Sequence, residues 1–350
     1  MKAWLLKQIG DISFEDVEEA PVSSNEVRVK VKAAGICGSD IPRVYQTGAH
    51  KMPLICGHEF SGIVDGTGAE ADRKWDKKRV GVFPLIPCGK CKSCRQKKYE
   101  LCRDYDYVGS RRNGAFAEYV NVPEWNLIEL PENVPFDAAA MLEPMAVAVH
   151  AARLGTEGFT LQYDSRITVC GLGTIGSFVV MFLKDAGYQN VYAVCKHEYQ
   201  AKRAEMFGIG KENIFTGSTL DAGKWIRQKL DDTDVFFECV GKNETVSLGI
   251  ECTGASGRVV LLGNPFSDMT MGKNIYWKIL RNQLTVTGSW NSTFDKSRDD
   301  DWHYVIERLA EGDIHPELMI SHRLPLERLE EGMHIMRDKS EEYGKLMVCM

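Results

Sequence analysis

The stretch Arg166-Ile-Thr-Val-Cys-Gly-Leu-Gly-Thr-Ile-Gly176 joins a β-branched run to a glycine-rich turn, and a helix-length apolar segment follows it. A G-x-G-x-x-G pattern is weak evidence alone, but between a strand and a helix it indicates a dinucleotide-binding turn. There Gly171 permits the tight turn, Gly173 lets the backbone approach a pyrophosphate, and Gly176 lets helix and strand pack closely. The helix N-terminus offers free N–H groups to the phosphates. The candidate contacts are Gly171, Gly173, Thr174, Ile175 and Gly176.

After residue 150, strand-like and helix-like segments alternate along the chain. Helix-length segments such as 174–186 and 198–207 lie between short apolar runs. Strands connected by such crossovers form an α/β fold with a doubly wound parallel sheet. The expected strands are residues 166–170, 191–195, 213–216, 234–239, 257–263 and 284–288.

The sequence before residue 150 has a different texture, with short β-branched runs that are punctuated by glycine. Alternation of this kind predicts a compact β-rich domain. The length of 350 residues is enough for two domains with separate cores. The expected strands of the first domain include residues 26–32, 60–64, 79–83 and 115–122.

The identity of the dinucleotide stays open at the end of the second expected strand, which reads Cys195-Lys196-His197. An Asp or Glu usually stands there and accepts hydrogen bonds from the ribose hydroxyls, and this chain lacks it. Cys195 is small and Lys196 is cationic, so the pair can accommodate a 2′-phosphate and NADP(H) is a candidate. Alternatively, Lys196 and His197 are solvated loop residues and NAD(H) binds without the acidic residue.

Composition and charge exclude several classes of protein. The N-terminus has no apolar segment of the signal-peptide kind, and no run approaches the roughly 18 apolar residues of a membrane span, so we expect a cytoplasmic protein without a membrane role. The net charge of −6 and the pI near 5.8 argue against a nucleic-acid partner. We therefore expect no nucleic-acid partner.

Four of the 11 cysteines lie in one short lysine-rich loop, with the spacing C-x2-C-x2-C-x7-C. In a reducing compartment this spacing favours a metal over disulfides. Four thiolates suit Zn²⁺, whereas the bacterial iron–sulfur pattern has a shorter last spacer and a following proline. A site with four sulfur ligands leaves no position for a substrate, so we expect a structural zinc. The ligands would be Cys88, Cys91, Cys94 and Cys102.

A second group of potential ligands lies outside this loop. Cys37 supplies a thiolate, and His58 with Glu59 supplies an imidazole and a carboxylate. Glu143 is a carboxylate in an otherwise apolar stretch, where an ionised side chain needs a cation or strong hydrogen bonds. Three such ligands can hold a zinc ion with one position open to an alcohol oxygen. Alternatively, Glu143 is a first-turn charge of a helix beside Pro144.

The chain as a whole resembles the zinc-dependent medium-chain alcohol and polyol dehydrogenases. This resemblance implies a GroES-like catalytic domain, built from residues 1–150 with the cysteine lobe 88–102 and completed by residues 289–350. It also implies a Rossmann domain at 151–288. The motifs that carry the resemblance are CGSD at Cys37, GHEFSG at Gly57, the four-cysteine lobe, NGAFAEYV at Asn113, LEPMAVAVH at Leu142, GLGTIG at Gly171 and ECVG at Glu238.

The resemblance also assigns roles to single residues. Cys37, His58 and Glu143 would hold a catalytic zinc, with Glu59 as an alternative ligand beside it. Asp40 would orient His58 through the second imidazole nitrogen. The residue carried over for substrate contact and proton transfer is Ser39, and Pro42 stands where many members of the family have a relay histidine.

Within the family, the resemblance implies a polyol phosphate as the substrate, with NAD or NADP as the cofactor. The alternatives are an unphosphorylated polyol, or a dinucleotide-binding protein that has lost catalysis. A phosphate group favours arginine donors, and the cations near the expected catalytic motifs are Arg43, His50, Lys51, Arg111 and Arg112. Similar basic pairs also occur in relatives with uncharged substrates. We also expect a homo-oligomer, either a dimer or a tetramer.

Overall fold

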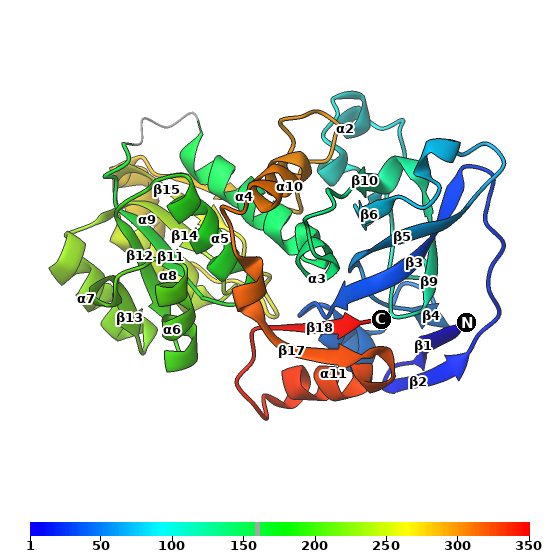
Figure 1. The fold of residues 1–350 in the computed structure, drawn as a ribbon. Coiled ribbons are helices and arrows are strands. Elements are labelled where there is room, and N and C mark those ends of the chain that lie inside the picture. Colours follow the sequence, from blue (N-terminus) through cyan, green and yellow to red (C-terminus); the bar gives the residue numbers. More distant parts are fainter. Residues whose placement is uncertain (158–161) are drawn as a thin grey trace. The chain divides into compact units, whose positions relative to one another are not determined.

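The computed structural model describes residues 1–157 and 162–350, which form two compact units (Figure 1). Unit 1 consists of Met1–Glu143 and Thr293–Met350, and unit 2 consists of Pro144–Ser292. The boundary expected after residue 150 lies within helix α4 (Leu142–Thr156), and the boundary expected after residue 288 lies at the end of strand β16 (Thr285–Gly288).

Unit 2 contains the predicted doubly wound sheet. Its six strands are all parallel, in the order β13-β12-β11-β14-β15-β16. These strands are β11 (Ile167–Cys170), β12 (Val191–Cys195), β13 (Ile214–Thr216), β14 (Thr233–Glu238), β15 (Thr253–Leu261) and β16. The helices are α5 (Thr174–Asp185), α6 (Glu198–Met206), α7 (Thr219–Leu230), α8 (Asn243–Cys252) and α9 (Lys273–Asn282).

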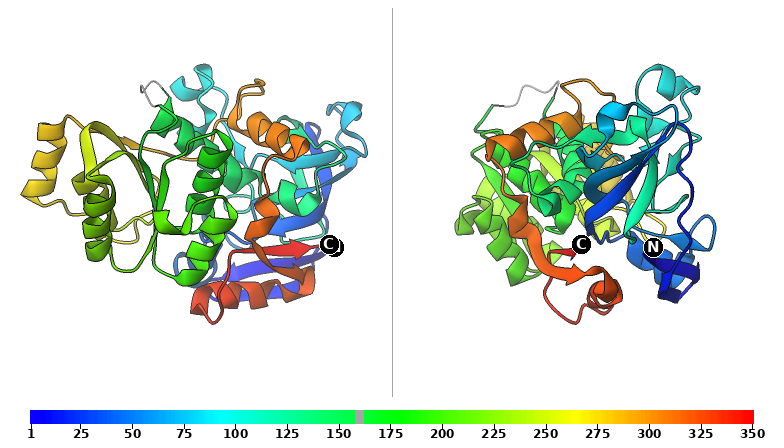
Figure 2. Two further views of the ribbon diagram at one scale, coloured as in Figure 1. Left: turned by 60° about the vertical axis from the view of Figure 1, so that its left-hand side comes forward. Right: turned by 45° about the vertical axis from the view of Figure 1, so that its right-hand side comes forward.

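Helices cover both faces of this sheet (Figure 2). Helices α5 and α6 contact each other, while α8 contacts both α7 and α9. Every residue of β11 and β12 is buried, as expected for parallel strands that are covered on two sides. The continuous apolar runs of these strands therefore have a tertiary cause, because both faces of the sheet meet apolar helix side chains.

Unit 1 is β-rich, and both ends of the chain build its main sheet. Strand β18 pairs antiparallel with β3 and parallel with β17, so the last residues of the chain lie beside Ala33, Ala34 and Gly35. The main sheet has the order β10-β6-β5-β3-β18-β17, with β9 also paired to β3. Its strands are β3 (Glu26–Gly35), β5 (Glu59–Thr67), β6 (Arg79–Val82), β9 (Tyr119–Pro123), β10 (Leu127–Glu129), β17 (Ile320–Pro325) and β18 (Lys345–Cys349).

Two smaller sheets complete unit 1, with the orders β2-β1-β4 and β7-β8. Their strands are β1 (Lys2–Gln8), β2 (Asp11–Asp16), β4 (Leu54–Ile55), β7 (Leu85–Ile86) and β8 (Asp106–Tyr107). The α-helices are α1 (Asp40–Pro42), α2 (Lys92–Arg95), α3 (Phe136–Ala140), α10 (Asp301–Glu311) and α11 (Leu329–Asp338). A π-helical turn, η1 (Arg43–Thr47), follows α1, and the 3-10 turns of unit 1 are η2 (Arg73–Trp75), η3 (Tyr99–Leu101), η4 (Glu124–Asn126), η6 (Pro316–Met319) and η7 (Leu326–Arg328). Another 3-10 turn, η5 (Lys211–Asn213), belongs to unit 2.

One expected strand is shorter than predicted. Residues 115–118 are not part of a strand, and β9 begins only at Tyr119. Ala117 instead makes a single bridge to Ala3, because this part of the chain crosses β1 rather than running along β3. Among residues 1–157 and 162–350, no helix is both long enough and apolar enough to cross a membrane.

Candidate active site

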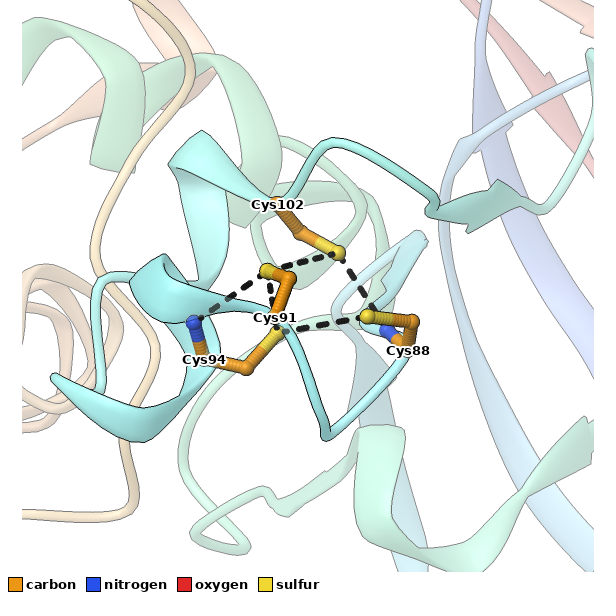
Figure 3. A group of neighbouring side chains, drawn as sticks. All are labelled: Cys88, Cys91, Cys94 and Cys102. Atoms are coloured by element: carbon orange, nitrogen blue, oxygen red, sulfur yellow. Dashed lines mark hydrogen bonds between the residues drawn. The ribbon is translucent and has the colours of Figure 1, made fainter.

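The four cysteines of the lobe converge on one point (Figure 3). Their sulfur atoms lie 3.5 Å apart for Cys91 and Cys94, and 3.9 Å apart for the pairs Cys88–Cys94 and Cys91–Cys102. A tetrahedron with Zn–S arms of about 2.3 Å has edges of about 3.8 Å. The four thiols thus already have the spacing of a closed zinc site, and the cluster fits a structural zinc ion.

Backbone N–H groups also point at these sulfur atoms. The amide of Cys94 lies 3.5 Å from the Cys91 sulfur, and the amide of Cys88 lies 3.3 Å from the Cys102 sulfur. The N–H groups of Cys94 and Arg103 lower the pKa of Cys91 to about 6. Since the thiolate is the form that binds metal, this backbone arrangement favours metal binding.

The cysteine lobe is an insertion between two paired strands. Strand β7 enters it and β8 leaves it, with Leu85 opposite Tyr107 and Ile86 opposite Asp106. Beyond this two-stranded stem, the amide of Val108 donates to the carbonyl of Pro84 at 2.9 Å. The metal of the lobe therefore closes a loop whose two ends are already held together by the β7–β8 stem, a name we keep below.

A second group of ligands forms where β3 ends and β5 begins. Gly35 pairs with Glu59, so the segment that leaves β3 at Cys37 and the segment that enters β5 at His58 lie at the same end of the sheet. One ligand atom from each of Cys37, His58 and Glu59 lies within 4.8 Å of the others. Thiolate, imidazole and carboxylate together are a donor set that zinc accepts, and three protein ligands leave one position open. We call this group the open site.

Asp40 lies beneath the open site and is completely buried. It accepts a hydrogen bond from the Cys37 amide at 3.0 Å, and it forms an ion pair with Arg43 at 2.5 Å. Burial acts to raise the pKa of Asp40, but the cationic His58 and Arg43 outweigh it and lower that pKa. The distance from Asp40 Oδ1 to His58 Nδ1 is 3.6 Å, longer than a hydrogen bond, so the orienting role of Asp40 stays a prediction.

Glu59 has a partner that the sequence analysis missed. The Lys345 ammonium, from β18, forms an ion pair with Glu59 and donates to the carbonyl of Ile36 at 3.0 Å. The two side chains are only 2% exposed. Burial acts to lower the pKa of Lys345, but Glu59 and Cys37 outweigh it and raise that pKa. A lysine inside the apolar run of β18 was the available signal, because lysine is almost never fully buried without a partner.

Glu143 lies near the open site but is not a member of the 4.8 Å group among the described residues. It stands in the first turn of α4, and its Oε1 accepts a hydrogen bond from the Tyr107 hydroxyl at 3.2 Å. Burial raises its pKa to about 7, and the charge of Glu59 adds to this, whereas His58 and Lys345 act in the opposite direction. Sequence analysis predicted Glu143 as a ligand and Glu59 as the alternative; the structure groups Glu59 more closely with Cys37 and His58.

Ser39 is exposed at the same place. Its hydroxyl lies 3.3 Å from the sulfur of Cys37, so a molecule that reaches the open site also reaches this hydroxyl. Pro42, where a relay histidine stands in many relatives, is the last residue of α1 and has no proton to transfer.

The glycine-rich turn in unit 2 has the predicted form. Gly171 has a φ angle of +95°, which only glycine adopts readily, and a Cβ at Gly176 would lie 1.9 Å from the Gly171 carbonyl oxygen. A Cβ at Gly173 would meet no atom within 4 Å, so this face of the turn is open to a ligand. Helix α5 begins at Thr174, with its first N–H groups at the turn.

At the end of β12, Cys195 differs in solvent exposure from the two residues that follow it. Cys195 is 4% exposed, and its sulfur lies 3.6 Å from the Thr216 hydroxyl, whereas Lys196 and His197 are exposed. The amides of Lys196 and His197 both donate to the Gln200 side chain at 3.2 Å. The loop is therefore held in place by its backbone, and the exposed side chains of Lys196 and His197 remain available to a ligand.

Most of the cations considered for phosphate recognition have other partners. Arg112 pairs with Glu26, and Arg111 donates to the Tyr105 carbonyl at 3.0 Å while stacking on that ring. These contacts hold both side chains to unit 1. They favour a role for Arg111 and Arg112 in the packing of unit 1 over a role in binding phosphate. Arg43 pairs with Asp40 beside the open site, and His50 and Lys51 are exposed.

Comparison with known proteins supplies independent information. A family model described as the alcohol dehydrogenase GroES-like domain matches residues 23–132, and one described as zinc-binding dehydrogenase matches residues 174–311. The chain is 33% identical over 313 residues to galactitol 1-phosphate 5-dehydrogenase of Escherichia coli (strain K12), which covers 88% of each chain.

Solved structures agree over the whole chain. The crystal structure of galactitol-1-phosphate dehydrogenase from Escherichia coli matches with a TM-score of 0.89 and 30% identity, and covers 100% of both chains. A zinc-binding dehydrogenase from Sinorhizobium meliloti 1021, bound to NADP, matches with a TM-score of 0.88 and 27% identity, and covers 100% of this chain and 99% of that one.

Proposed function

Because the chain belongs to the family of zinc-binding dehydrogenases with a GroES-like domain, and is thus an oxidoreductase that uses zinc and a nicotinamide dinucleotide, we propose that its substrate is a polyol phosphate. The reaction would convert a secondary hydroxyl into the ketone of a keto-sugar phosphate. The observation that carries this proposal is the similarity, over 88% of each chain, to an enzyme that acts on galactitol 1-phosphate.

We propose that Cys37, His58 and a carboxylate hold the catalytic zinc. Glu59 is supported by its place in the 4.8 Å group, and Glu143 by its buried position nearby. When bound, zinc acts as a Lewis acid on the substrate oxygen, and the nicotinamide accepts or returns a hydride. The glycine-rich turn at Gly171–Gly176 binds the pyrophosphate of that cofactor in this proposal.

Ser39 is the residue that we assign to the substrate hydroxyl. Its exposed Oγ, beside Cys37, can accept the proton that the alcohol loses and can return it in the reverse direction. Beyond Ser39 the proton passes to water or to the cofactor ribose, because Pro42 cannot relay it. For the phosphate, we assign Arg43, which pairs with Asp40 beside the open site.

A substrate panel tests this function. The purified protein is assayed with hexitols and hexitol phosphates, each with NAD and with NADP, after its zinc content has been measured. We expect about two zinc ions per chain and the highest kcat/KM on a hexitol phosphate. A preference for an unphosphorylated hexitol would replace the proposed substrate, and one zinc ion without turnover would indicate a protein that has lost catalysis.

We further propose that the chain forms a homo-oligomer through the edge of the sheet in unit 2. Strand β16 pairs with β15, and no other described strand covers its second side. An uncovered edge favours pairing with another strand, and a second copy of the chain supplies the same edge across a two-fold axis. Exposed apolar side chains gather in this part of the sequence: Phe266, Met269, Met271, Tyr276, Trp277, Leu280, Val286 and Trp290.

A charge on β16 tests this surface. We expect Val286→Lys to lower the molar mass measured by light scattering to that of one chain, because paired lysines across the axis repel each other. Leu220→Lys is the matched control, since Leu220 is also exposed but lies on α7. An unchanged mass for Val286→Lys would place the contact elsewhere.

A further inference from the structure

Tyr107 is a residue of unit 1 that the assignment of roles has so far left out. It lies on β8, and its hydroxyl donates a hydrogen bond to Glu143 Oε1 at 3.2 Å. Its ring also meets the imidazole of His58 edge-on, with centroids 5.8 Å apart and planes at 66°. One side chain thus contacts two residues of the candidate active site.

The backbone of Tyr107 is held on both sides. Tyr107 faces Leu85 across the β7–β8 stem, and its carbonyl accepts hydrogen bonds from the amides of Arg111 at 2.9 Å and Arg112 at 3.2 Å. The cysteine lobe closes the other end of this stem, with Cys102 five positions before Tyr107. The backbone of Tyr107 is therefore held by strand pairing on one side and by hydrogen bonds on the other.

Glu143 needs such a restraint more than Glu59 does. Glu59 is paired with the ammonium of Lys345, which fixes its position by charge. Glu143 is 9% exposed, and within residues 1–157 and 162–350 the Tyr107 hydroxyl is the one side-chain group that donates a hydrogen bond to its carboxylate. A neutral hydroxyl restrains one carboxylate oxygen and adds no charge, so the other oxygen keeps its ability to accept a proton or bind a cation.

We propose that Tyr107 is a positioning residue that holds Glu143 in its working orientation, and that the stem of the cysteine lobe thereby contributes to the geometry of the open site. This inference rests on the proposed function, since it assumes that Glu143 serves that site. It gives the lobe a role besides stability, because the lobe and Tyr107 share the same stem.

The test compares Tyr107→Phe with Tyr105→Phe in the zinc-loaded protein. Phenylalanine keeps the ring beside His58 and removes only the hydroxyl. We expect kcat to fall about tenfold, equivalent to about 1.4 kcal/mol, while KM stays within about twofold. Tyr105→Phe should retain normal kcat, because Tyr105 contacts Tyr107 and Arg111 through its ring and its backbone carbonyl.

A second readout does not depend on turnover. With Co²⁺ in place of zinc, Tyr107→Phe should change the visible absorption of the open site and speed the loss of that metal to a chelator, while the metal of the lobe is retained. A wild-type kcat and metal-release rate in Tyr107→Phe would overturn the proposal, as would equal losses in both variants or a loss confined to KM. If the wild-type protein turns over no alcohol, the proposed function fails, and the Co²⁺ measurement still decides whether Tyr107 holds Glu143.

Discussion

At the scale of single residues, two carboxylates of unit 1 meet different surroundings. Glu59 forms a buried ion pair with the ammonium of Lys345. Glu143, in the first turn of the apolar helix α4, accepts a hydrogen bond from the neutral hydroxyl of Tyr107. Its pKa rises to about 7 because burial penalises the charged form. The two carboxylates therefore differ in their partners: Glu59 has a charged partner in Lys345, whereas Glu143 has a neutral one in Tyr107.

Cofactor choice also depends on one residue. We expect Cys195→Asp to raise the ratio of kcat/KM with NAD to that with NADP by about tenfold or more, because a carboxylate at the end of β12 accepts hydrogen bonds from the ribose and repels a 2′-phosphate. Steady-state kinetics with both cofactors measures this ratio. Cys195→Ser is the control for size without charge, and an unchanged ratio in the Asp variant would mean that Cys195 does not lie at the ribose.

At the scale of elements, the cysteine lobe shows how a metal replaces a hydrophobic core. The lobe consists of α2, η3 and connecting loops between β7 and β8, and much of its surface is charged and exposed. Such a segment buries too little apolar area to order itself. Binding of a zinc ion to the four thiolates would supply the missing free energy, because metal binding to such a site is coupled to folding.

Replacing a lobe ligand should therefore affect stability first. We expect Cys91→Ser to release one zinc ion and to lower the Tm by roughly 5–10 °C, as a loss of a few kcal/mol does for a domain of this size. Zinc analysis and calorimetry measure both effects. Cys252→Ser, at a buried cysteine of unit 2, is the control for loss of a thiol alone. Two tightly bound zinc ions at full stability in Cys91→Ser would contradict the structural assignment.

At the scale of the whole molecule, the chain divides its chemistry between two units. The open site and the cysteine lobe are in unit 1, and the glycine-rich turn is in unit 2 with its own sheet and core. Each unit has its own set of long-range strand pairs. Dinucleotide binding and metal-dependent chemistry should thus be separable by mutation.

We expect His58→Ala to reduce turnover by more than about a hundredfold, which exceeds the loss typical of mutating a residue that only supports a metal ligand. The dissociation constant for the dinucleotide should change little. A rate assay and a fluorescence titration with cofactor measure the two properties. His150→Ala provides a histidine control outside the ligand set. Near-normal turnover of His58→Ala would refute the metal site proposed here.

The sequence by itself was sufficient for the local features. The parallel sheet, the glycine-rich turn and the four-cysteine lobe follow from spacing and periodicity within short segments, and the structure has all three. Cys37 and His58 lie just beyond the paired ends of β3 and β5, and this pairing brings the two local motifs together.

Only the tertiary structure could identify the partners of the site residues. Lys345 reaches Glu59 because β18 pairs with β3, and Tyr107 on β8 donates a hydrogen bond to Glu143, which lies 36 positions farther along the chain. The same is true of Arg112, which looked available for a phosphate until it was found paired with Glu26. Sequence patterns report which side chains are apolar, small or metal-binding, whereas the burial and the pairing of a charge depend on segments that are distant along the chain and meet only after folding.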